Sequence, residues 1–434
     1  MSGDEGMVFS AADRQKEDLI GWLRATRAEK LEELWHTADE TRAQNVGDRV
    51  NVWGAIKLSN HCVDRCAFCG LRGDNRQIER YRMDASGILV CARQAASLGC
   101  GTVLLQSGRD LQLPDDLANT IRCIRDQTGL KVALSLGERS EAELKVWRQA
   151  GADTYLLRFL TANPTLFRLL HQGRIADPRR RLPLLAMIRQ LGYQVGSGIL
   201  VGFPGQSHAS LADDLGILRT LDPDVVMVGP YIWPAEFGSW RRSPRSGDAN
   251  SVQSVLTAVA LARQLCPNAD IVSGAALSTV GSLEAHGLAL QRGANTLILD
   301  LTPPNLRDAN RCYPGRRALV PEVFHSAPEE LAATITRWRS GAVIASNCGQ
   351  QAERLRIGIC MGSSCFSRGN NRLVAALKEL LATEGLEQHV LLEGHLCEGF
   401  CSDGPNVTID GEYRHQADPA DVIKTIRHHP RLKA

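Results

Sequence analysis

Three cysteines stand close together early in the chain, Cys62, Cys66 and Cys69, with the spacing CxxxCxxC. Thiolates in one short loop can bind three irons of a [4Fe-4S] cubane, which leaves the fourth iron without a protein ligand. The open iron can bind the amino and carboxylate groups of a small molecule. The loop therefore predicts a cluster that takes part in a reaction. A structural zinc ion is the alternative, but it requires four closed ligands, and the nearest further candidate, His61, directly adjoins Cys62.

Four more cysteines form two pairs near the C-terminal end of the chain. Cys360 and Cys365 stand in CMGSSC, and Cys397 and Cys401 stand in CEGFC. Four thiolates complete a [2Fe-2S] cluster with two ligands on each iron. Zinc bound by the same four cysteines is the competing interpretation, although zinc pairs usually have the shorter CxxC spacing. The sequence therefore predicts two metal sites of different kinds.

The elements that must position the first cysteine loop alternate along most of the chain. Helical segments such as 84–98, 139–150, 179–192, 208–220 and 250–265 separate short apolar or β-branched runs. These runs predict eight strands, at 51–58, 102–106, 131–136, 154–158, 194–200, 224–229, 270–274 and 295–299. This α/β pattern favours a (β/α)8 barrel, with the cysteines after the first strand on the face where barrels carry active sites. An open doubly wound sheet is the alternative, disfavoured because no GxGxxG follows the first strand.

Changes in this pattern predict the domain boundaries. Residues 1–48 form a helical extension, because 11–45 are charged, rich in Leu and Ala and nearly free of Pro and Gly. Residues 49–325 form the barrel, and 326–355 form a linker that contains one helix. Residues 356–434 follow the order strand, helix, strand, strand, helix, which predicts a second, compact α/β domain around the later cysteines.

The composition narrows the range of partners. The 434 residues are 44% hydrophobic and carry a formal net charge of +2, so no general attraction to nucleic acid or membrane is expected. No apolar run reaches membrane-spanning length and the first residues lack a secretory signal, which predicts a cytoplasmic protein with reduced cysteines. The Arg-rich stretches 174–181 and 241–245 are interpreted as solvated surface rather than RNA contacts.

Over residues 50–320 the sequence resembles the radical S-adenosylmethionine (SAM) superfamily, in the branch that contains biotin synthase, methylornithine synthase and, most of all, the HydE-type maturase of FeFe-hydrogenase. The likeness is carried by SNHCVDRCAFCGLRGDN, RYRMD, LLQSGRD, SLGER, YLLRF with TANP, GSGILVGFPGQS, GPYIWP, TPPN and CYPG. The resemblance implies a radical SAM enzyme that cleaves SAM reductively to a 5′-deoxyadenosyl radical acting on a small substrate. It favours maturation of the diiron cofactor of hydrogenase. Sulfur insertion or rearrangement on another small molecule, and a non-enzymatic electron carrier or scaffold, remain as alternatives.

The matched motifs also imply which residues contact SAM and the substrate. Each has a structural alternative: a rim salt bridge, a plain turn, loop capping or packing. The residues implied for SAM are Phe68 (cluster or adenine), Ser107 and Gly108 (amino group), Glu138 (ribose), Arg158 (carboxylate) and Gly202 with Pro204 and Gly205 (adenine). Those expected to line the substrate cavity are Leu160, Tyr231, Asp300, Thr302 and Tyr313, whereas Cys312 is interpreted as a small buried hydrophobe.

Two positions depart from the maturase pattern. Arg109 stands where the maturase motif QSGED has its acidic residue, although Asp110 follows, and Leu160 replaces an acidic residue after the LLR motif. We expect the change at Arg109 to affect how the cysteine loop is held. We expect Leu160 to alter the substrate chemistry.

Residues 356–434 resemble the thioredoxin-like [2Fe-2S] ferredoxins. The resemblance favours an electron relay to the [4Fe-4S] cluster over a sacrificial sulfur donor of the kind that biotin synthase uses. It implies an external electron donor such as a ferredoxin, a flavodoxin or a reductase. Proteins of cofactor maturation are further candidate partners.

Overall fold

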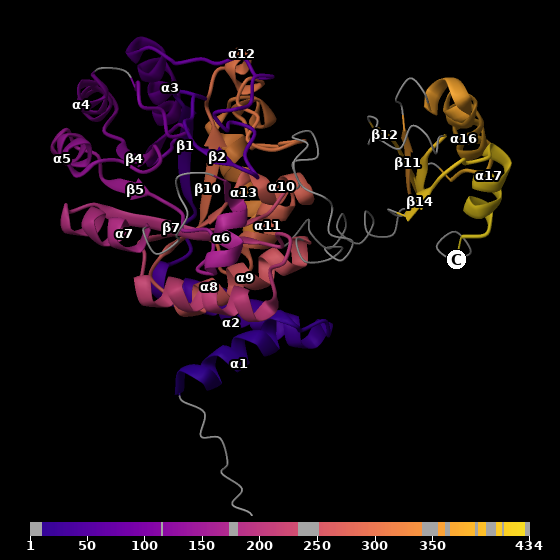
Figure 1. Ribbon diagram of the computed structural model, residues 1–434, viewed down its shortest axis with the longest axis horizontal. Coiled ribbons are helices and arrows are strands. Elements are labelled where there is room, and N and C mark those ends of the chain that lie inside the picture. Colours follow the sequence, from indigo (N-terminus) through magenta and orange to yellow (C-terminus); the bar gives the residue numbers. More distant parts are fainter. Residues whose placement is uncertain are drawn as a thin grey trace, which may run out of the picture. The chain divides into compact units, whose positions relative to one another are not determined.

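The structure is a computed structural model. It describes residues 11–113, 116–172, 181–232, 251–340, 355–360, 365–386, 389–395, 405–409 and 412–429. The chain divides into two compact units, Met1–Ala342 and Val343–Ala434 (Figure 1). Among the described residues, no helix combines the length and the apolar character that crossing a membrane requires.

The first unit is built around a closed barrel of eight parallel strands in the order β1-β10-β9-β8-β7-β5-β4-β3. These are β1 (Asn51–Lys57), β3 (Thr102–Gln106), β4 (Lys131–Ser135), β5 (Thr154–Leu156), β7 (Gln194–Val201), β8 (Val225–Pro230), β9 (Asp270–Ser273) and β10 (Thr296–Asp300). Strand β1 pairs with both β3 and β10, which closes the barrel and excludes the open doubly wound sheet. The predicted (β/α)8 architecture is confirmed.

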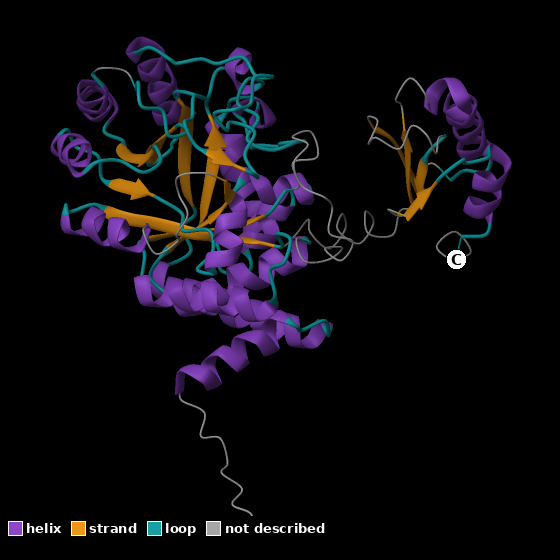
Figure 2. Ribbon diagram, viewed as in Figure 1, coloured by secondary structure: helices purple, strands orange, loops and turns teal. Residues whose placement is uncertain are grey.

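Helices surround this barrel (Figure 2). They are α3 (Ala85–Ser97), α4 (Leu117–Thr128), α5 (Glu141–Gln149), α6 (Pro164–Leu170), α7 (Arg181–Gln190), α8 (His208–Leu221), α9 (Val252–Leu265), α10 (Ala275–Val280), α11 (Ala285–Leu290), α12 (Pro304–Arg307) and α13 (Pro328–Ser340). Local sequence starts several of them: Asp84 caps α3, and Ser140 forms a capping box with Glu143 at the start of α5. Inside the barrel, Trp53 and Leu104 belong to a separate apolar cluster that fills its centre.

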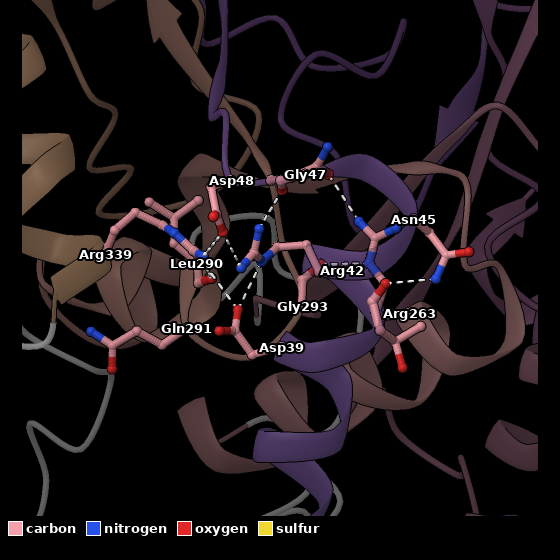
Figure 3. Close-up of polar contacts among 12 residues, drawn as sticks. Asp39, Arg42, Asn45, Gly47, Asp48, Arg263, Leu290, Gln291, Gly293 and Arg339 are labelled. Carbon is pink, nitrogen blue, oxygen red and sulfur yellow. Dashed lines mark hydrogen bonds and ion pairs between the residues drawn. The ribbon is translucent and has the colours of Figure 1, made fainter.

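Two helices, α1 (Ala11–Leu23) and α2 (Ala28–Val46), precede β1 and pack on α8 and α9 (Figure 1). The buried Arg42 of α2 donates to Asp39 at 2.8 Å, to Asp48 at 3.0 Å and to the carbonyl of Gly47. Arg339 of α13 contacts the same two carboxylates, at 3.0 and 3.4 Å (Figure 3). Because Gly47 and Asp48 lie just before β1, this network joins α2 and α13 to the segment that leads into the first barrel strand.

The second unit contains a four-stranded sheet in the order β12-β11-β13-β14. Strands β11 (Leu355–Cys360) and β12 (Val390–His395) are parallel, and β13 (Val407–Ile409) and β14 (Glu412–Arg414) continue the sheet antiparallel. The leucines of α16 (Asn371–Thr383) and two residues of α17 (Pro419–Arg427) cover the apolar side chains of β11. The sequence predicted each of these elements except β14, which is only three residues long.

Candidate cluster and cofactor sites

Cys62, Cys66 and Cys69 lie in the loop that follows β1, at the C-terminal end of the barrel strands, and all three are half-buried. Part of this loop, β2 (Arg65–Cys66), pairs antiparallel with β6 (His171–Gln172), a two-residue strand that the sequence did not predict. The cysteine loop is therefore attached by its backbone to a segment about a hundred residues further along the chain.

Backbone hydrogen bonds anchor the cysteine loop to three distant parts of the barrel. The donors are amides within the loop, and the acceptors are carbonyls after β3, at the end of α6 and after α12. The pairs are Val63 N–H with Arg109 (3.0 Å), Ala67 N–H with Leu170 (2.8 Å) and Gly70 N–H with Cys312 (2.7 Å). These anchors fix the directions of the cysteines without using their sulfur atoms.

A single guanidinium group also binds the loop from within. Arg80 donates to the carbonyls of Leu71 (3.0 Å), Arg72 (2.7 Å) and Asn75 (3.0 Å), and to that of Asn60. A planar fork with five donors can bind these four carbonyls at once, whereas a lysine has only three donors. Arg80 is the first residue of the RYRMD motif, and the motif alone predicted no role for it.

Gly108, at the end of β3, packs directly against the cysteine loop. A Cβ atom at this position would lie 2.5 Å from the carbonyl oxygen of His61, 2.6 Å from Cys62 Cβ and 3.1 Å from its Sγ. The neighbouring Ser107 hydroxyl donates to the Gly108 carbonyl at 2.7 Å. The approach of the loop thus requires a glycine here, and contact of Ser107 and Gly108 with the SAM amino group stays a prediction.

The donor set suits an iron–sulfur cluster. Burial raises the pKa of Cys66 to about 12, so in the absence of metal its thiol keeps a proton that a metal ion would displace. Within the described parts of the chain, no three His, Cys, Asp or Glu side chains converge closely enough to hold one metal ion. A cubane needs no such convergence, because each of its three thiolates binds a different iron.

A fourth thiol adjoins this group. The thiol of Cys312 lies next to that of Cys69 and raises its pKa, and the Cys312 sulfur also contacts the side-chain oxygen of Asn310 at 3.4 Å. The interpretation of Cys312 as an isolated packing residue is therefore incomplete, because the fold brings it to the cluster loop from a position 243 residues beyond Cys69.

Arg181, for which the sequence predicted no role at the site, links two of the residues predicted to contact SAM, Glu138 and Arg158. Arg181 donates to Glu138 at 3.0 Å, to the carbonyl of Arg158 at 2.7 Å and to the ring of His171 at 3.2 Å. Arg181 ends an Arg-rich stretch that was interpreted as solvated surface, yet its side chain is buried. That interpretation was wrong for Arg181, because α7 places it towards the barrel mouth. Residues 174–180 and 241–245 lie outside the described residues.

Arg158 differs from Arg181 in having a guanidinium that no described residue binds. Among the described residues, its side chain has no hydrogen-bond or ion-pair partner, and burial lowers its pKa. Tyr313 and Cys312 lie close enough to act on it electrostatically. A partly buried cation at the mouth of the barrel, with no such partner among the described residues, is well suited to an anionic group of a ligand.

Aromatic rings line the side of the loop that carries Phe68. Its ring meets that of His171 edge to face at 5.8 Å, and His171 stacks on Phe167 at 4.1 Å. Burial lowers the pKa of His171 to about 3, so the ring is neutral at physiological pH. Its Nδ1 faces the Phe167 carbonyl at 3.3 Å, which leaves Nε2 to accept from Arg181.

The GFPGQS segment forms a turn after β7. Gly202 and Gly205 both have φ +84°, a conformation that glycine adopts without strain. The Gly202 amide donates to Gln206 Oε1 at 2.6 Å. The turn itself explains both glycines, so contact of Gly202 with adenine stays a prediction.

The residues predicted for the substrate cavity fall into two groups. Leu160 packs with Phe203 and Tyr231 in an apolar cluster. Its φ of +71° is uncommon for a side chain of this size. Hydrogen bonds on both sides hold this conformation, from Leu160 N–H to the Gly198 carbonyl (3.0 Å) and from Leu200 N–H to the Leu160 carbonyl (3.1 Å).

The second group is ionic. Asp300, at the end of β10, contacts Lys57 Nζ at 2.5 Å and Arg316 at 2.7 Å. Burial opposes its ionisation, but the two cations hold the pKa of Asp300 well below its usual range. The Thr302 hydroxyl accepts from the Lys57 amide at 3.1 Å, and burial raises the pKa of Tyr313 to about 12. Asp300 and Thr302 are thus already engaged in joining β1 to β10.

The structure also explains the departure at Arg109. Its guanidinium binds Asp64, inside the cysteine loop, with a shortest distance of 2.5 Å. The adjacent Asp110 is buried and accepts from Arg82 at 2.7 Å and from Ser59 at 2.6 Å. Arg109 therefore holds the loop directly, while Asp110 ties the end of β3 to the RYRMD segment.

In the second unit, Cys360 and Cys365 are both buried. The Asn370 side chain donates to the Cys360 carbonyl at 2.8 Å, and the Asn406 side chain donates to Cys365 Sγ at 3.6 Å. A buried cysteine sulfur that accepts an amide N–H is suited to act as a thiolate ligand of a metal. Cys397 and Cys401 lie outside the described residues.

Comparison with known proteins agrees with this geometry. Residues 56–217, which include the cysteine loop, match the Radical SAM superfamily. The [FeFe] hydrogenase maturase subunit HydE of Thermotoga maritima is 38% identical over 288 residues, covering 66% of this chain and 80% of HydE. The chain belongs to the radical SAM superfamily. Biotin synthase of Streptomyces avermitilis is also similar, with 28% identity over 57% of this chain and 63% of that protein.

Solved structures and the second unit support the same assignment. The crystal structure of methylornithine synthase (PylB) matches with a TM-score of 0.57 and 26% identity, covering 68% of this chain and 87% of that one. Residues 349–429 match the thioredoxin-like [2Fe-2S] ferredoxins. This radical SAM protein is accordingly an enzyme with a [4Fe-4S] cluster, SAM and a [2Fe-2S] cluster as cofactors. Enzymes of this superfamily act on small molecules and need an electron donor.

Proposed function

We propose that this radical SAM enzyme carries out a HydE-like step in maturation of the FeFe-hydrogenase diiron cofactor. The observation that carries the proposal is the 38% identity to HydE over 288 residues. We assign Cys62, Cys66 and Cys69 as ligands of the [4Fe-4S] cluster. The site lies at the C-terminal end of the barrel strands, where barrel enzymes perform their chemistry.

The bound, reduced cluster supplies one electron that cleaves SAM to methionine and a 5′-deoxyadenosyl radical. Arg80 and Gly108 hold the cysteine loop so that its three thiols keep their directions when SAM binds. The guanidinium of Arg158, which no described residue binds, is the partner for the SAM carboxylate. Glu138 accepts from the ribose hydroxyls, and Arg181 holds its carboxylate in place.

Apolar side chains exclude water and radical quenchers from this site. Phe68, Leu160, Phe203 and Tyr231 form one cluster at the barrel mouth. The phenol of Tyr231 stays protonated, because burial raises its pKa to about 12. We propose Leu160, Tyr231 and Tyr313 as residues that face the substrate. Leu160 removes a negative charge relative to the maturase pattern, so the contact that the protein offers the substrate at that point is apolar.

The fused [2Fe-2S] domain is proposed to relay electrons towards the [4Fe-4S] cluster. The domain would receive these electrons from a ferredoxin, a flavodoxin or a reductase. Its [2Fe-2S] cluster would be bound by Cys360, Cys365, Cys397 and Cys401. A complete set of four cysteines in a separate domain supports electron transfer rather than sulfur donation. Loss of the relay should abolish SAM cleavage driven by a physiological reductant but not cleavage driven by dithionite.

The test of the proposal has two parts. The anaerobically reconstituted protein, with dithionite and SAM, should form 5′-deoxyadenosine, and Cys62→Ala should not. A strain that lacks HydE but keeps its hydrogenase and other maturases should regain hydrogenase activity with this protein. Formation of 5′-deoxyadenosine without recovery of hydrogenase would reject the maturase step and favour a rearrangement or sulfur insertion. No 5′-deoxyadenosine at all would favour the electron carrier or scaffold.

A further inference from the structure

Asn406 contacts both described cysteines of the second unit. Its main-chain carbonyl accepts from the Cys360 amide at 3.2 Å, and its side-chain Nδ2 donates to Cys365 Sγ at 3.6 Å. Asn370 supports the same residue by donating to the Asn406 carbonyl at 3.0 Å. Only 4% of the surface of Asn406 is exposed, and Cys365 is fully buried. The amide and the sulfur that it reaches are therefore both buried.

His415 determines which way this amide points. Its Nδ1 lies 2.8 Å from Asn406 Oδ1. A thiolate only accepts hydrogen bonds, so the amide must turn its N–H towards Cys365 and its oxygen towards the histidine. The oxygen also only accepts, so His415 Nδ1 must carry the proton. The donors consequently run in one direction, from His415 through Asn406 to the sulfur of Cys365.

We infer that Asn406, oriented by His415, is a positioning residue that raises the reduction potential of the [2Fe-2S] cluster. The inference rests on the proposed assignment of Cys365 as a cluster ligand. Reduction adds one negative charge to the cluster and its thiolates, and an N–H donor at sulfur stabilises that added charge. The hydrogen bond is therefore stronger in the reduced state, and burial enhances the difference.

The expected size follows from ordinary hydrogen-bond energies. A net contribution of about 1 kcal/mol changes an equilibrium roughly fivefold. A change of about three- to tenfold in the reduction equilibrium corresponds to roughly 30–60 mV, at 59 mV per decade for one electron. Such a shift is large enough to decide the direction of electron flow between two centres of similar potential.

The experiment is a redox titration of the full-length, anaerobically reconstituted protein, followed by the electron paramagnetic resonance signal of the reduced [2Fe-2S] cluster. Asn406→Leu should lower the midpoint potential most, because it removes the donor while retaining the volume. His415→Ala should lower it less, since the amide stays but loses its orientation. His415→Asn restores a side-chain N–H near the Nδ1 position and should return the potential towards wild type.

His428→Ala is the matched control. His428 is exposed, and its ring contacts the Lys424 carbonyl at 2.8 Å within its own helix turn, so its loss should leave the potential unchanged. Asn406→Leu with a full cluster signal and the wild-type potential overturns the inference. If Asn406→Leu fails to assemble a cluster, His415→Ala decides: a lowered potential restored by His415→Asn supports the inference, and no shift overturns it. Should Cys365→Ala keep the intact [2Fe-2S] signal, the ligand assignment itself is wrong and the inference fails with it.

Discussion

The two cysteine groups are held in opposite ways. In the barrel, half-buried thiols stand on one loop, which hydrogen bonds from β3, α6, Arg80 and the Cys312 segment hold by its backbone. In the second unit, Cys360 and Cys365 are buried, and an amide donates to one of the sulfurs themselves. A cluster that binds SAM needs an accessible iron, so its loop must be supported from outside. A cluster that only passes electrons can be enclosed, and its surroundings can act on the sulfurs.

The largest effect should come from removing one ligand in each group. Cys62→Ala is expected to remove the [4Fe-4S] signal and all SAM cleavage while leaving the [2Fe-2S] spectrum intact. Cys365→Ala should do the reverse, keeping cleavage with dithionite. Spectra and 5′-deoxyadenosine formation measure both. Loss of both clusters from either variant would show that the two cysteine groups depend on each other, which would contradict their being held independently.

A smaller but clear effect is expected at Gly108. Gly108→Ala places a methyl group against the His61 carbonyl and Cys62, and overpacking of this kind costs about 1–3 kcal/mol. The loop must shift, so [4Fe-4S] occupancy and SAM affinity should fall roughly tenfold or more. Gly101→Ala, before β3, is the control, since a Cβ there meets nothing within 4 Å. Equal behaviour of the two variants in cluster content and SAM binding would contradict the proposed packing.

Arg80→Met tests whether backbone support matters as much as the ligands. It leaves several loop carbonyls without their donor, and we expect about 2 kcal/mol less stabilisation of the loop. The [4Fe-4S] cluster should form but be lost several times faster to a chelator. Arg76→Met, an exposed arginine in the same segment, is the control. If Arg80→Met and Arg76→Met lose the cluster at the same rate, Arg80 does not stabilise the cysteine loop.

The smallest effect should be that of Arg109→Ala. Its ion pair with Asp64 is partly exposed, and such pairs usually contribute about 1 kcal/mol or less. We expect the SAM dissociation constant to rise less than about fivefold. A double-mutant cycle with Asp64→Ala isolates the pair. An effect above tenfold would mean that Arg109 contacts SAM or the substrate directly.

The sequence alone determined the chemistry that the chain can perform. Three local properties carry this information: the spacing of Cys62, Cys66 and Cys69, the apolar periodicity of the eight strands, and the matched motifs. Patterns among residues that are close in the chain can be recognised from the sequence. The barrel and the ferredoxin-like unit followed from them, apart from short elements such as β2, β6 and β14. Two or three residues contain too little periodicity to be seen without their partners.

The tertiary structure alone decided which side chains surround the site. Arg181 is buried beside Glu138 rather than solvated, Cys312 lies next to Cys69, and Asn406, just before β13, reaches Cys365. Each of these contacts joins residues that are 41 or more positions apart in the sequence. Closure of the barrel and pairing of the sheet bring such residues together, and no spacing within the chain records that proximity. The same cysteine spacing is therefore compatible with many sets of neighbouring side chains. The fold determines which side chains surround the cysteines, and these set the reactivity of the bound cluster.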